Sequence, residues 1–393
     1  MRTNIKSYYD LLNFGLGSSS FQQFVDRFQA KYNTLQLDGF EFDPEIQLNY
    51  QYEQLITSLN IATLPVYMDE SSQALDKAHG EFVIGKDRIP TQKHRYPINA
   101  KMLREHMIMY EKFGDASLSN DTRNGILNIL FDSLDKLLGG GRNALTHQRM
   151  RTVSKGELTI DVENNPRGLT GLKFEFGIPK ENKAALKGNA RWWTGTTHTT
   201  ATEGSESDPL LFLKDKYKEI RRKGTPKGHF EISQDLFDDM LMHSKVLKRI
   251  GYSSYPVAAG DAAAESYAQN LTDEAKAEAI KRIIGAPVIV RDSVAAVEKF
   301  DSSEKKLVVN TIDNFDTKNV SFIPDGLIGT VKSVKPLVIS EDPTQRVAWF
   351  DGGRTLVTQQ YEAATKSMYV ESEMSMLCVP NMPNYMYINT VTA

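Results

Sequence analysis

The sequence of 393 residues predicts an α+β fold, in which helical and strand-rich stretches occupy different parts of the chain. Three observations predict it. Residues 119–156 repeat leucine at helical spacing over a long stretch. Residues 157–205 then change to short strands joined by turns. Near the C-terminus, the segment MYVESEMSMLCVP alternates apolar and polar residues, which is typical of a strand with one buried face.

Composition limits the classes of partner. Lys and Arg together number 47 and Asp and Glu 50, so the net charge of −3 gives no reason to expect nucleic acid or an anionic membrane as the main partner. No run of 18 apolar residues and no leader segment is visible, so we expect no membrane span and no secretion. The single cysteine, Cys378, lies in the alternating strand and is expected to be a buried, inert thiol in a chain made in a reducing compartment.

Near the N-terminus, the segment SSSFQQFVDRFQAKY predicts a short amphipathic helix. Phe21, Phe24, Val25 and Phe28 fall at positions i, i+3, i+4 and i+7 and therefore share one face. Two interpretations are open. The helix packs on the core of its own chain, or it belongs to an arm that docks on a neighbouring subunit, which the irregular flanking segments favour.

Residues 60–100 predict a long two-stranded excursion. Its return strand carries one acid, Asp87, and four basic residues: Lys86, Arg88, Lys93 and Arg95. These are either ordinary charges on a solvated hairpin tip or the contacts of a projecting loop with an acidic neighbour.

The long helix at 119–156 contains the triplet Gly139-Gly140-Gly141, which predicts a real break with at least one residue at positive φ. The sequence GGGR invites comparison with a phosphate loop. It follows a helix rather than a strand, however, and lacks the GK[ST] ending, so we expect no nucleotide site there.

Downstream elements are marked by their end residues. Asp208 and Pro209 begin a helix that Gly224 ends, Thr272 caps a helix that ends at Gly285, and Ser233 begins a helix that is expected to run to Gly251. Residues 250–345 read as a separate α/β unit, with an alanine-rich loop or short helix near 257–268. Within this unit, SFIPDGLIGTV predicts a tight turn at Pro324-Asp325-Gly326 between two apolar strands, with Gly326 at positive φ.

No motif for catalysis is present. The seven histidines include no HExxH pair, and neither a GxSxG elbow nor a GxGxxG loop after a strand occurs. We therefore expect no catalytic residue, no cofactor and no metal ligand. A cytosolic enzyme with a site assembled from scattered residues stays as an alternative, which a deep pocket lined by residues with shifted pKa values would favour.

The order of these parts resembles the major capsid proteins of tailed bacteriophages, with the Hong Kong-97-type fold, and most of all the lambda capsid-protein-E branch. The segments that carry the resemblance are RIPTQKHRYPINAKMLRE, DPLLFLKDKYKEIRRKGTPKGHFEIS, KRIIGAPVIVRD and SFIPDGLIGTVK. The resemblance implies the following parts: an N-terminal arm (1–59), an E-loop hairpin (60–100), a peripheral domain with a spine helix (101–224), an axial domain (225–345) and C-terminal strands that return to the peripheral domain (346–393).

The resemblance also implies a function. Copies of such a chain form pentamers and hexamers of an icosahedral shell around a double-stranded DNA genome, with scaffold and portal proteins as partners, loose contact with the DNA and no membrane. The chain would be a component of the virion capsid, assembled in the host cytoplasm. The expected subunit-interface residues are Phe21, Phe24, Phe28, Lys86, Arg88, Lys93 and Arg95. A cellular encapsulating shell protein or another virion component are the alternatives within the same class.

Overall fold

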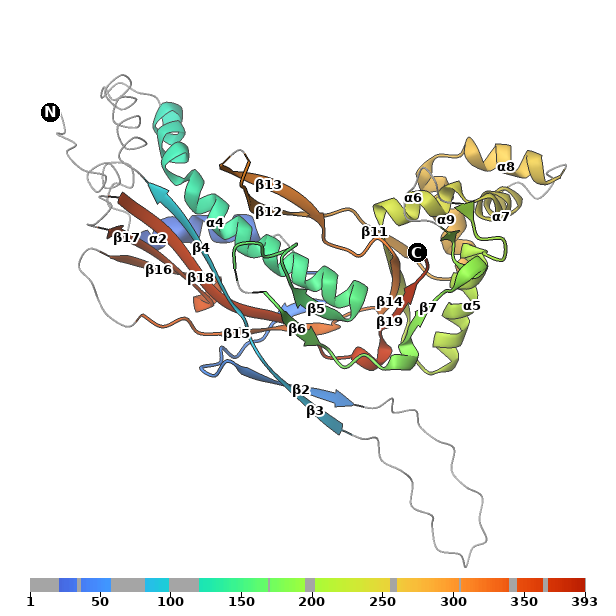
Figure 1. The fold of residues 1–393 in the computed structure, drawn as a ribbon, viewed down its shortest axis with the longest axis horizontal. Coiled ribbons are helices and arrows are strands. Elements are labelled where there is room, and N and C mark those ends of the chain that lie inside the picture. The colour runs from blue at the N-terminus through green and yellow to red at the C-terminus, as the bar shows by residue number, and fades with distance from the viewer. Residues whose placement is uncertain are drawn as a thin grey trace, which may run out of the picture.

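Two lobes, each built on its own β-sheet, make up the body of the chain in a computed structural model (Figure 1). A long helix, α4 (Asn120–Lys155), runs along the first lobe. Mixed helix and sheet confirm the α+β class. The structure describes these residues: 21–33, 37–57, 82–98, 120–168, 170–194, 202–254, 260–303, 305–338, 345–362 and 367–392.

The first lobe contains a six-stranded sheet. Its strands follow the order β1-β15-β18-β17-β16, and β4 pairs with the remaining part of β18. All pairs are antiparallel except β1 with β15. The bounds are β1 (Phe40–Phe42), β4 (Thr91–Ile98), β15 (Gly329–Val334), β16 (Arg346–Phe350), β17 (Thr355–Glu362) and β18 (Ser367–Pro380). The helices that pack on this lobe are α4 and α2 (Phe21–Asn33).

The second lobe contains a five-stranded sheet in the order β11-β10-β14-β19-β7, packed with five helices. The strands are β7 (Lys183–Ala185), β10 (Gly228–Ser233), β11 (Val288–Arg291), β14 (Asn319–Pro324) and β19 (Tyr387–Thr390). The helices are α5 (Pro209–Arg222), α6 (Gln234–Met242), α7 (Ser244–Ser254), α8 (Asp261–Gln269) and α9 (Asp273–Ile284). Aromatic rings fill its core, with the centroids of Phe230 and Phe322 5.4 Å apart.

Four further strand pairs join neither large sheet within the described residues. They are β2 (Gln51–Thr57) with β3 (Phe82–Arg88), β5 (Glu157–Ile160) with β6 (Leu172–Glu175), β8 (Trp193–Thr194) with β9 (Thr202–Glu203), and β12 (Val294–Asp301) with β13 (Lys306–Asp313). Short 3-10 helices complete the fold at η1 (Lys180–Asn182), η2 (Gly188–Ala190), η3 (Asp351–Gly353) and η4 (Pro383–Tyr385).

Helix ends in the second lobe confirm the predicted capping. The side chain of Asp208 accepts a hydrogen bond from the Leu211 amide at 3.0 Å, and Pro209 occupies the first turn. Gly285 ends α9 in the left-handed region at φ +87. The helix expected between Ser233 and Gly251 is in fact two helices, α6 and α7, which meet at the fully buried His243.

The predicted break at the glycine triplet is wrong, because α4 runs unbroken through it. Each glycine instead admits a close neighbour. A Cβ on Gly139 would lie 3.1 Å from the Tyr32 hydroxyl, one on Gly140 2.7 Å from the His94 ring, and one on Gly141 3.2 Å from a methionine sulfur of β18. The triplet therefore lets α2, β4 and β18 approach the helix at the point where all three meet it.

The turn at Pro324-Asp325-Gly326 is present, and Gly326 has φ +97 as predicted. The strands that it joins belong to different sheets, however, because β14 lies in the five-stranded sheet and β15 in the six-stranded sheet. The turn is therefore a crossing between the lobes.

Three segments lie in other parts of the structure than the order of the sequence suggests. Residues 91–98 form β4 and pair with β18 instead of with the outgoing strand, and the strand that pairs with β3 is β2, which lies before residue 60. Helix α5, assigned to the peripheral part, packs in the core of the five-stranded lobe. Strand β19, expected to return to the peripheral domain, pairs with β14 and β7 in that same lobe. The lobes are therefore assembled from segments that lie far apart in the sequence.

Two other expectations concern Cys378 and membranes. Cys378 is fully buried, and burial raises the pKa of its thiol to about 12, so it is an inert core residue as predicted. Among the described helices, none has the length and apolar character needed to cross a membrane.

Candidate subunit interface and the ion cluster between the lobes

Helix α2 packs on its own chain. Val25 is fully buried, and Phe21 retains 9% of its surface. The side-chain amide of Gln22 donates to the carbonyl oxygen of Trp349 and accepts from the amide of the same residue, both at 2.7 Å. In this way the Gln22 side chain satisfies backbone groups of β16, which ends the sheet. At the other end of α2, the Tyr32 hydroxyl donates to an Asp135 carboxylate oxygen of α4 at 2.5 Å.

These contacts favour the interpretation in which the N-terminal helix belongs to the core of its own subunit. Phe21 is already largely covered by its own chain, and its expected contact with a neighbouring subunit stays a prediction. Phe28 is half-buried and keeps some surface for a neighbour. The Phe24 side chain lies outside the described residues.

The basic return strand also makes contacts within the subunit. Lys93 on β4 pairs with Glu373 on β18, with Nζ 2.7 Å from the carboxylate oxygen. The Arg95 guanidinium lies over the Tyr369 ring at 4.7 Å, and that of Arg88 lies over the Tyr50 ring at 5.2 Å. Lys93 and Arg95 are therefore part of the large sheet rather than of a projecting loop.

Arg88, Lys93 and Arg95 remain exposed to solvent, so their expected contacts with a second copy stay a prediction. The Lys86 side chain lies outside the described residues.

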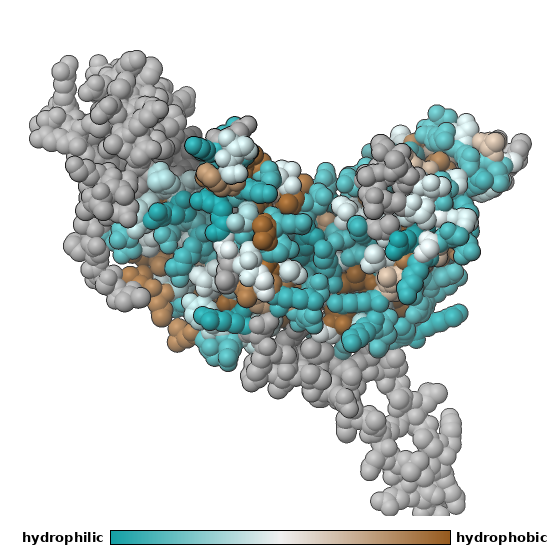
Figure 2. All heavy atoms as spheres, in the orientation of Figure 1, coloured by the Kyte–Doolittle hydropathy of each residue, from teal (hydrophilic) through white to brown (hydrophobic). Residues whose placement is uncertain are grey.

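Hairpin β12–β13 carries an apolar face that the sequence analysis missed. Four of its large apolar side chains are about half exposed: Val294 (55%), Phe300 (56%), Leu307 (48%) and Val309 (61%). Phe300 lies opposite Leu307 across the hairpin. Val309 lies opposite Glu298, which is two residues before Phe300 on the same strand. Because side chains alternate between the faces of a strand, all four lie on one face. In Figure 2, hydrophobic atoms reach the surface near the place of this hairpin in Figure 1.

The alternation at Val294, Ala296 and Phe300 was a signal in the sequence that could have revealed this face. It could not have shown that the face points to solvent, since the same alternation is typical of a strand that buries its apolar side. The face is exposed because no further strand or helix among the described residues covers it.

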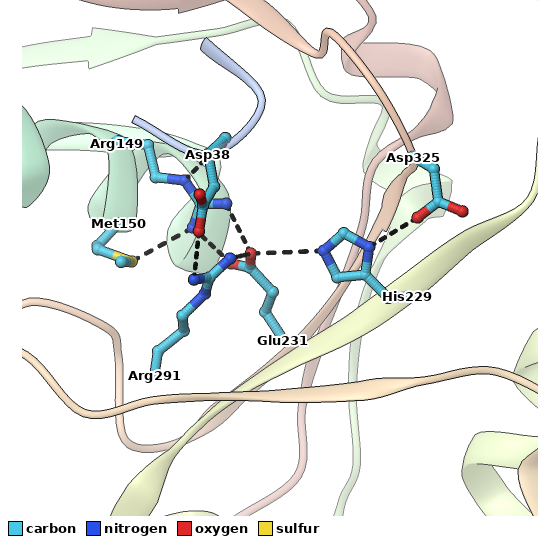
Figure 3. Close-up of polar contacts among 7 residues, drawn as sticks. All are labelled: Asp38, Arg149, Met150, His229, Glu231, Arg291 and Asp325. Atoms are coloured by element: carbon cyan, nitrogen blue, oxygen red, sulfur yellow. Dashed lines mark hydrogen bonds and ion pairs between the residues drawn. The ribbon is translucent and has the colours of Figure 1, made fainter. Parts of the chain in front are cut away.

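A cluster of charges joins the lobes (Figure 3). Arg149 of α4 makes two hydrogen bonds to the Glu231 carboxylate of β10, both at 2.6 Å. Arg291 of β11 contacts the same carboxylate and also Asp38, whose oxygen lies 2.6 Å from its Nη1. One fully buried carboxylate thus holds two guanidinium groups from different parts of the fold.

The electrostatics of this cluster follow from burial and pairing. Burial alone would raise the pKa of Glu231, but Arg149, His229 and Arg291 outweigh it and hold the pKa well below its usual range. The carboxylate is therefore ionised, and the pair is a structural link between α4 and the second lobe. Removal of one partner from such a buried pair is far more costly than its net contribution suggests.

His229 extends the cluster to the crossing turn. Its Nδ1 lies 2.9 Å from an Asp325 carboxylate oxygen and its Nε2 lies 3.6 Å from Glu231. Burial alone would lower the pKa of His229, but the nearby carboxylates of Glu231 and Asp325 raise it above the ordinary value.

An open cavity of about 840 Å³ lies beside the cluster. Apolar residues such as Phe40 and Ile289 line it together with Arg142, Arg149 and Arg291. Each of these arginines already pairs with a carboxylate of the chain, so the cavity is not built as an anion site. In the part of the chain that the structure describes, no group of three or more potential ligands is placed to hold a metal.

Comparisons with known proteins give a consistent description at low similarity. No family model matches the chain, and no curated protein matches it. A prophage protein of E. coli CFT073 that is described as a capsid protein aligns at 12% identity over 97% of this chain and 98% of its own, with a TM-score of 0.46. A phage-related protein from Bordetella bronchiseptica RB50 aligns at 13% identity over 93% and 96%, with a TM-score of 0.45.

The mature capsid of bacteriophage PhiM1 aligns at 10% identity over 90% of this chain and 86% of its own, with a TM-score of 0.37. These descriptions name phage-related or capsid proteins. At such identities and TM-scores the alignments do not assign a function, which must be argued from the residues of this chain.

Proposed function

We propose that this chain is a major capsid protein whose copies assemble into pentamers, hexamers and a closed icosahedral shell around a double-stranded DNA genome. The observation that carries the proposal is the exposed apolar face of hairpin β12–β13 on a subunit whose two lobes are otherwise well packed. A second copy of the chain is the partner that would cover this face.

The hairpin needs a partner for physical reasons. Two strands alone are marginally stable in water, and this pair adds no third strand within the described residues. Complete burial of a Val, Leu or Phe side chain contributes roughly 1.5–3 kcal/mol, so covering four half-exposed ones contributes about 3–6 kcal/mol. Association costs about 4–15 kcal/mol. One such contact would therefore be weak, and stable assembly requires several contact surfaces on each subunit.

The fold offers further surfaces of this kind. Hairpin β2–β3 leaves the first lobe, and its strands pair only with each other among the described residues (Figure 1). The outward side chains Arg88, Lys93 and Arg95 lie on β3 and β4. We assign β2–β3 to the E-loop, α4 and the six-stranded lobe to the peripheral domain, and the five-stranded lobe to the axial domain.

The remaining features of the proposal follow from charge and chemistry. A net charge of −3 fits a shell that touches packaged DNA loosely, because tight binding to phosphates requires many unpaired cations. The role is structural rather than enzymatic and requires no cofactor. Scaffold and portal proteins are the expected partners, the host cytoplasm is the expected place of assembly, and the virion capsid is the final location.

Assembly of the purified chain tests the proposal. Sedimentation velocity over a range of concentrations, with electron micrographs of the same samples, should show capsomers of five- or six-fold symmetry or closed particles. The double variant Phe300→Ser/Val309→Ser should remain folded and assemble poorly. A protein that stays monomeric at every concentration, both alone and with the scaffold encoded beside it, would contradict the proposal.

A further inference from the structure

We infer that His229 is a proton-dependent latch between the two lobes, which holds the crossing turn against β10 firmly when it is protonated and less firmly when it is neutral. The inference depends on the fold alone and does not require the proposed shell function. It concerns the contact between Asp325 in the turn and the ion cluster beneath it (Figure 3).

The position of the turn makes it a natural place for such control. It connects β14 of the five-stranded sheet with β15 of the six-stranded sheet, so any change in its attachment changes how firmly the lobes are coupled. Two backbone contacts hold the turn whatever the pH: the Asp325 amide donates to the Lys227 carbonyl at 2.9 Å, and the Ile328 amide donates to that of Gly39 at 2.7 Å. The side chain of Asp325 contacts His229 and is 63% exposed.

Charge balance explains why the proton matters. The groups that face His229 are Glu231 on its own strand, Arg291 on β11, Arg149 on α4, Asp38 in the segment before β1, and Asp325 in the turn. Its partner on β14, Ile323, carries no charge. Two guanidinium groups therefore face three carboxylates.

A protonated His229 brings this cluster to zero net charge and donates toward both Glu231 and Asp325. A neutral His229 has one N–H and leaves one carboxylate uncompensated. With its one proton on Nδ1, the neutral ring still donates to the Asp325 carboxylate oxygen 2.9 Å away, but the attraction of the imidazolium charge is lost and the turn is held less firmly.

The sign of the pH dependence follows from the direction of the shift. The pKa of His229 is raised above its ordinary value by its two carboxylate partners, against the opposing effect of burial. Stabilisation by the latch is therefore complete below the unfolded-state pKa of about 6.5 and is lost as the pH rises through the folded-state pKa. The turn is therefore held more firmly at acid pH than at basic pH.

Other described histidines have the opposite behaviour. Burial lowers the pKa of His94, His147 and His243, so these side chains are held neutral. His147 is a suitable control, because it is similarly buried and its Nδ1 lies 2.9 Å from the Asn314 side-chain oxygen, with no carboxylate partner at that distance.

The experiment measures Tm against pH, from about pH 5 to about pH 9, for the full chain and for His229→Gln. The wild type should exceed His229→Gln by on the order of 1–3 °C at acid pH, and this gap should close as the pH rises. His147→Gln should show the opposite trend, with the wild type gaining relative to the variant as the pH rises. A gap for His229→Gln that is constant, or that widens with pH, overturns the latch.

A second measurement keeps the inference testable if His229→Gln does not fold. NMR titration of the wild type should place the pKa of His229 above 6.5, and Asp325→Asn should lower it. Hydrogen exchange, corrected for the intrinsic effect of pH, should show faster opening at residues 325–329 as His229 loses its proton. A pKa at or below 6.5, or exchange at these residues that does not follow the titration, overturns the latch. Neither result depends on whether the chain assembles. Evidence against the latch would therefore leave the proposed shell function untouched, and evidence against the shell function would leave the latch untouched.

Discussion

The five-stranded lobe and the β12–β13 hairpin use aromatic and aliphatic side chains in opposite ways. In the lobe, Phe322 is fully buried and its ring lies 5.4 Å from that of Phe230 and 6.0 Å from that of Tyr217. On the hairpin, Phe300 and Val309 are more than half exposed. The comparison teaches that the stability of the subunit resides in the lobes, whereas the hairpin leaves an apolar surface exposed, which the proposed assembly would cover.

The same substitution at a buried and at an exposed phenylalanine tests this difference between lobe and hairpin, and it has the largest expected effect on the free energy of unfolding. Phe322→Ala should lower the free energy of unfolding by about 3–5 kcal/mol, since it removes a buried ring from a packed aromatic core. Phe300→Ala should lower it by less than about 1 kcal/mol, because the ring is already largely hydrated. Denaturant unfolding of the dissociated subunit measures both. Equal losses would show that the hairpin is part of the stabilising core.

The close approach at Gly140 sharpens the account of the first lobe. Alanine is better than glycine within a helix by about 1 kcal/mol, so propensity alone predicts that Gly140→Ala stabilises the protein. The new Cβ would lie 2.7 Å from the His94 ring, and we expect a net loss of about 1–3 kcal/mol instead.

In a His94→Ala background the clash is gone, and Gly140→Ala should then stabilise by about 1 kcal/mol. Urea unfolding of the two single variants and the double variant gives the coupling directly. If Gly140→Ala stabilises the protein with His94 present, the close-packing explanation of the triplet is wrong.

The smallest expected effect concerns the first turn of α5. Asp208 caps this helix and also pairs with Arg249, so its two roles must be separated. Asp208→Ala should cost about 0.5–2 kcal/mol, the usual range for a lost cap. Asp208→Asn keeps an acceptor for the Leu211 amide and loses only the partly exposed ion pair, so it should cost less than about 1 kcal/mol. Thermal unfolding distinguishes the two, and equal costs would mean that the ion pair rather than the cap is what matters.

Local chemistry explains which elements the sequence could predict. Caps such as Asp208 and Thr272, the left-handed Gly285 and the turn glycine Gly326 act within a few residues of themselves, and each was found where expected. The face of β18 that carries Met376 and Cys378 was likewise visible as a period of two, but the sequence did not show that Ser375, Leu377 and Val379 on the opposite face are buried too. Features that depend only on residues a few positions apart in the sequence can be predicted without knowledge of the tertiary fold.

Long-range pairing explains what the sequence could not predict. Strand β4 pairs with β18 across more than half of the chain, and its alternation fits either a hairpin or a sheet. The meaning of Gly140 depends on His94, which no local rule places against it. The ion cluster draws Asp38, Arg149 and Glu231 from distant segments, and none of them stands in a recognisable motif.

At the candidate interface, too, local features could be predicted from the sequence and long-range contacts could not. Aromatic spacing identified the α2 helix, but it did not show that Phe21 is covered by its own chain. The basic run at 86–95 was visible, whereas the fact that Lys93 pairs with Glu373 depends on the register of two distant strands.

Hydrogen exchange on free and assembled protein tests the central claim most directly, because it reads the lobes and the hairpins in the same sample. In the free subunit, amides of β10, β14 and α4 should be well protected and those of β12–β13 should exchange rapidly. In the assembled form, protection should rise on β12–β13 and β2–β3 and stay unchanged in the lobes. Rapid exchange of β12–β13 in the assembly, or full protection already in the free subunit, would contradict the account.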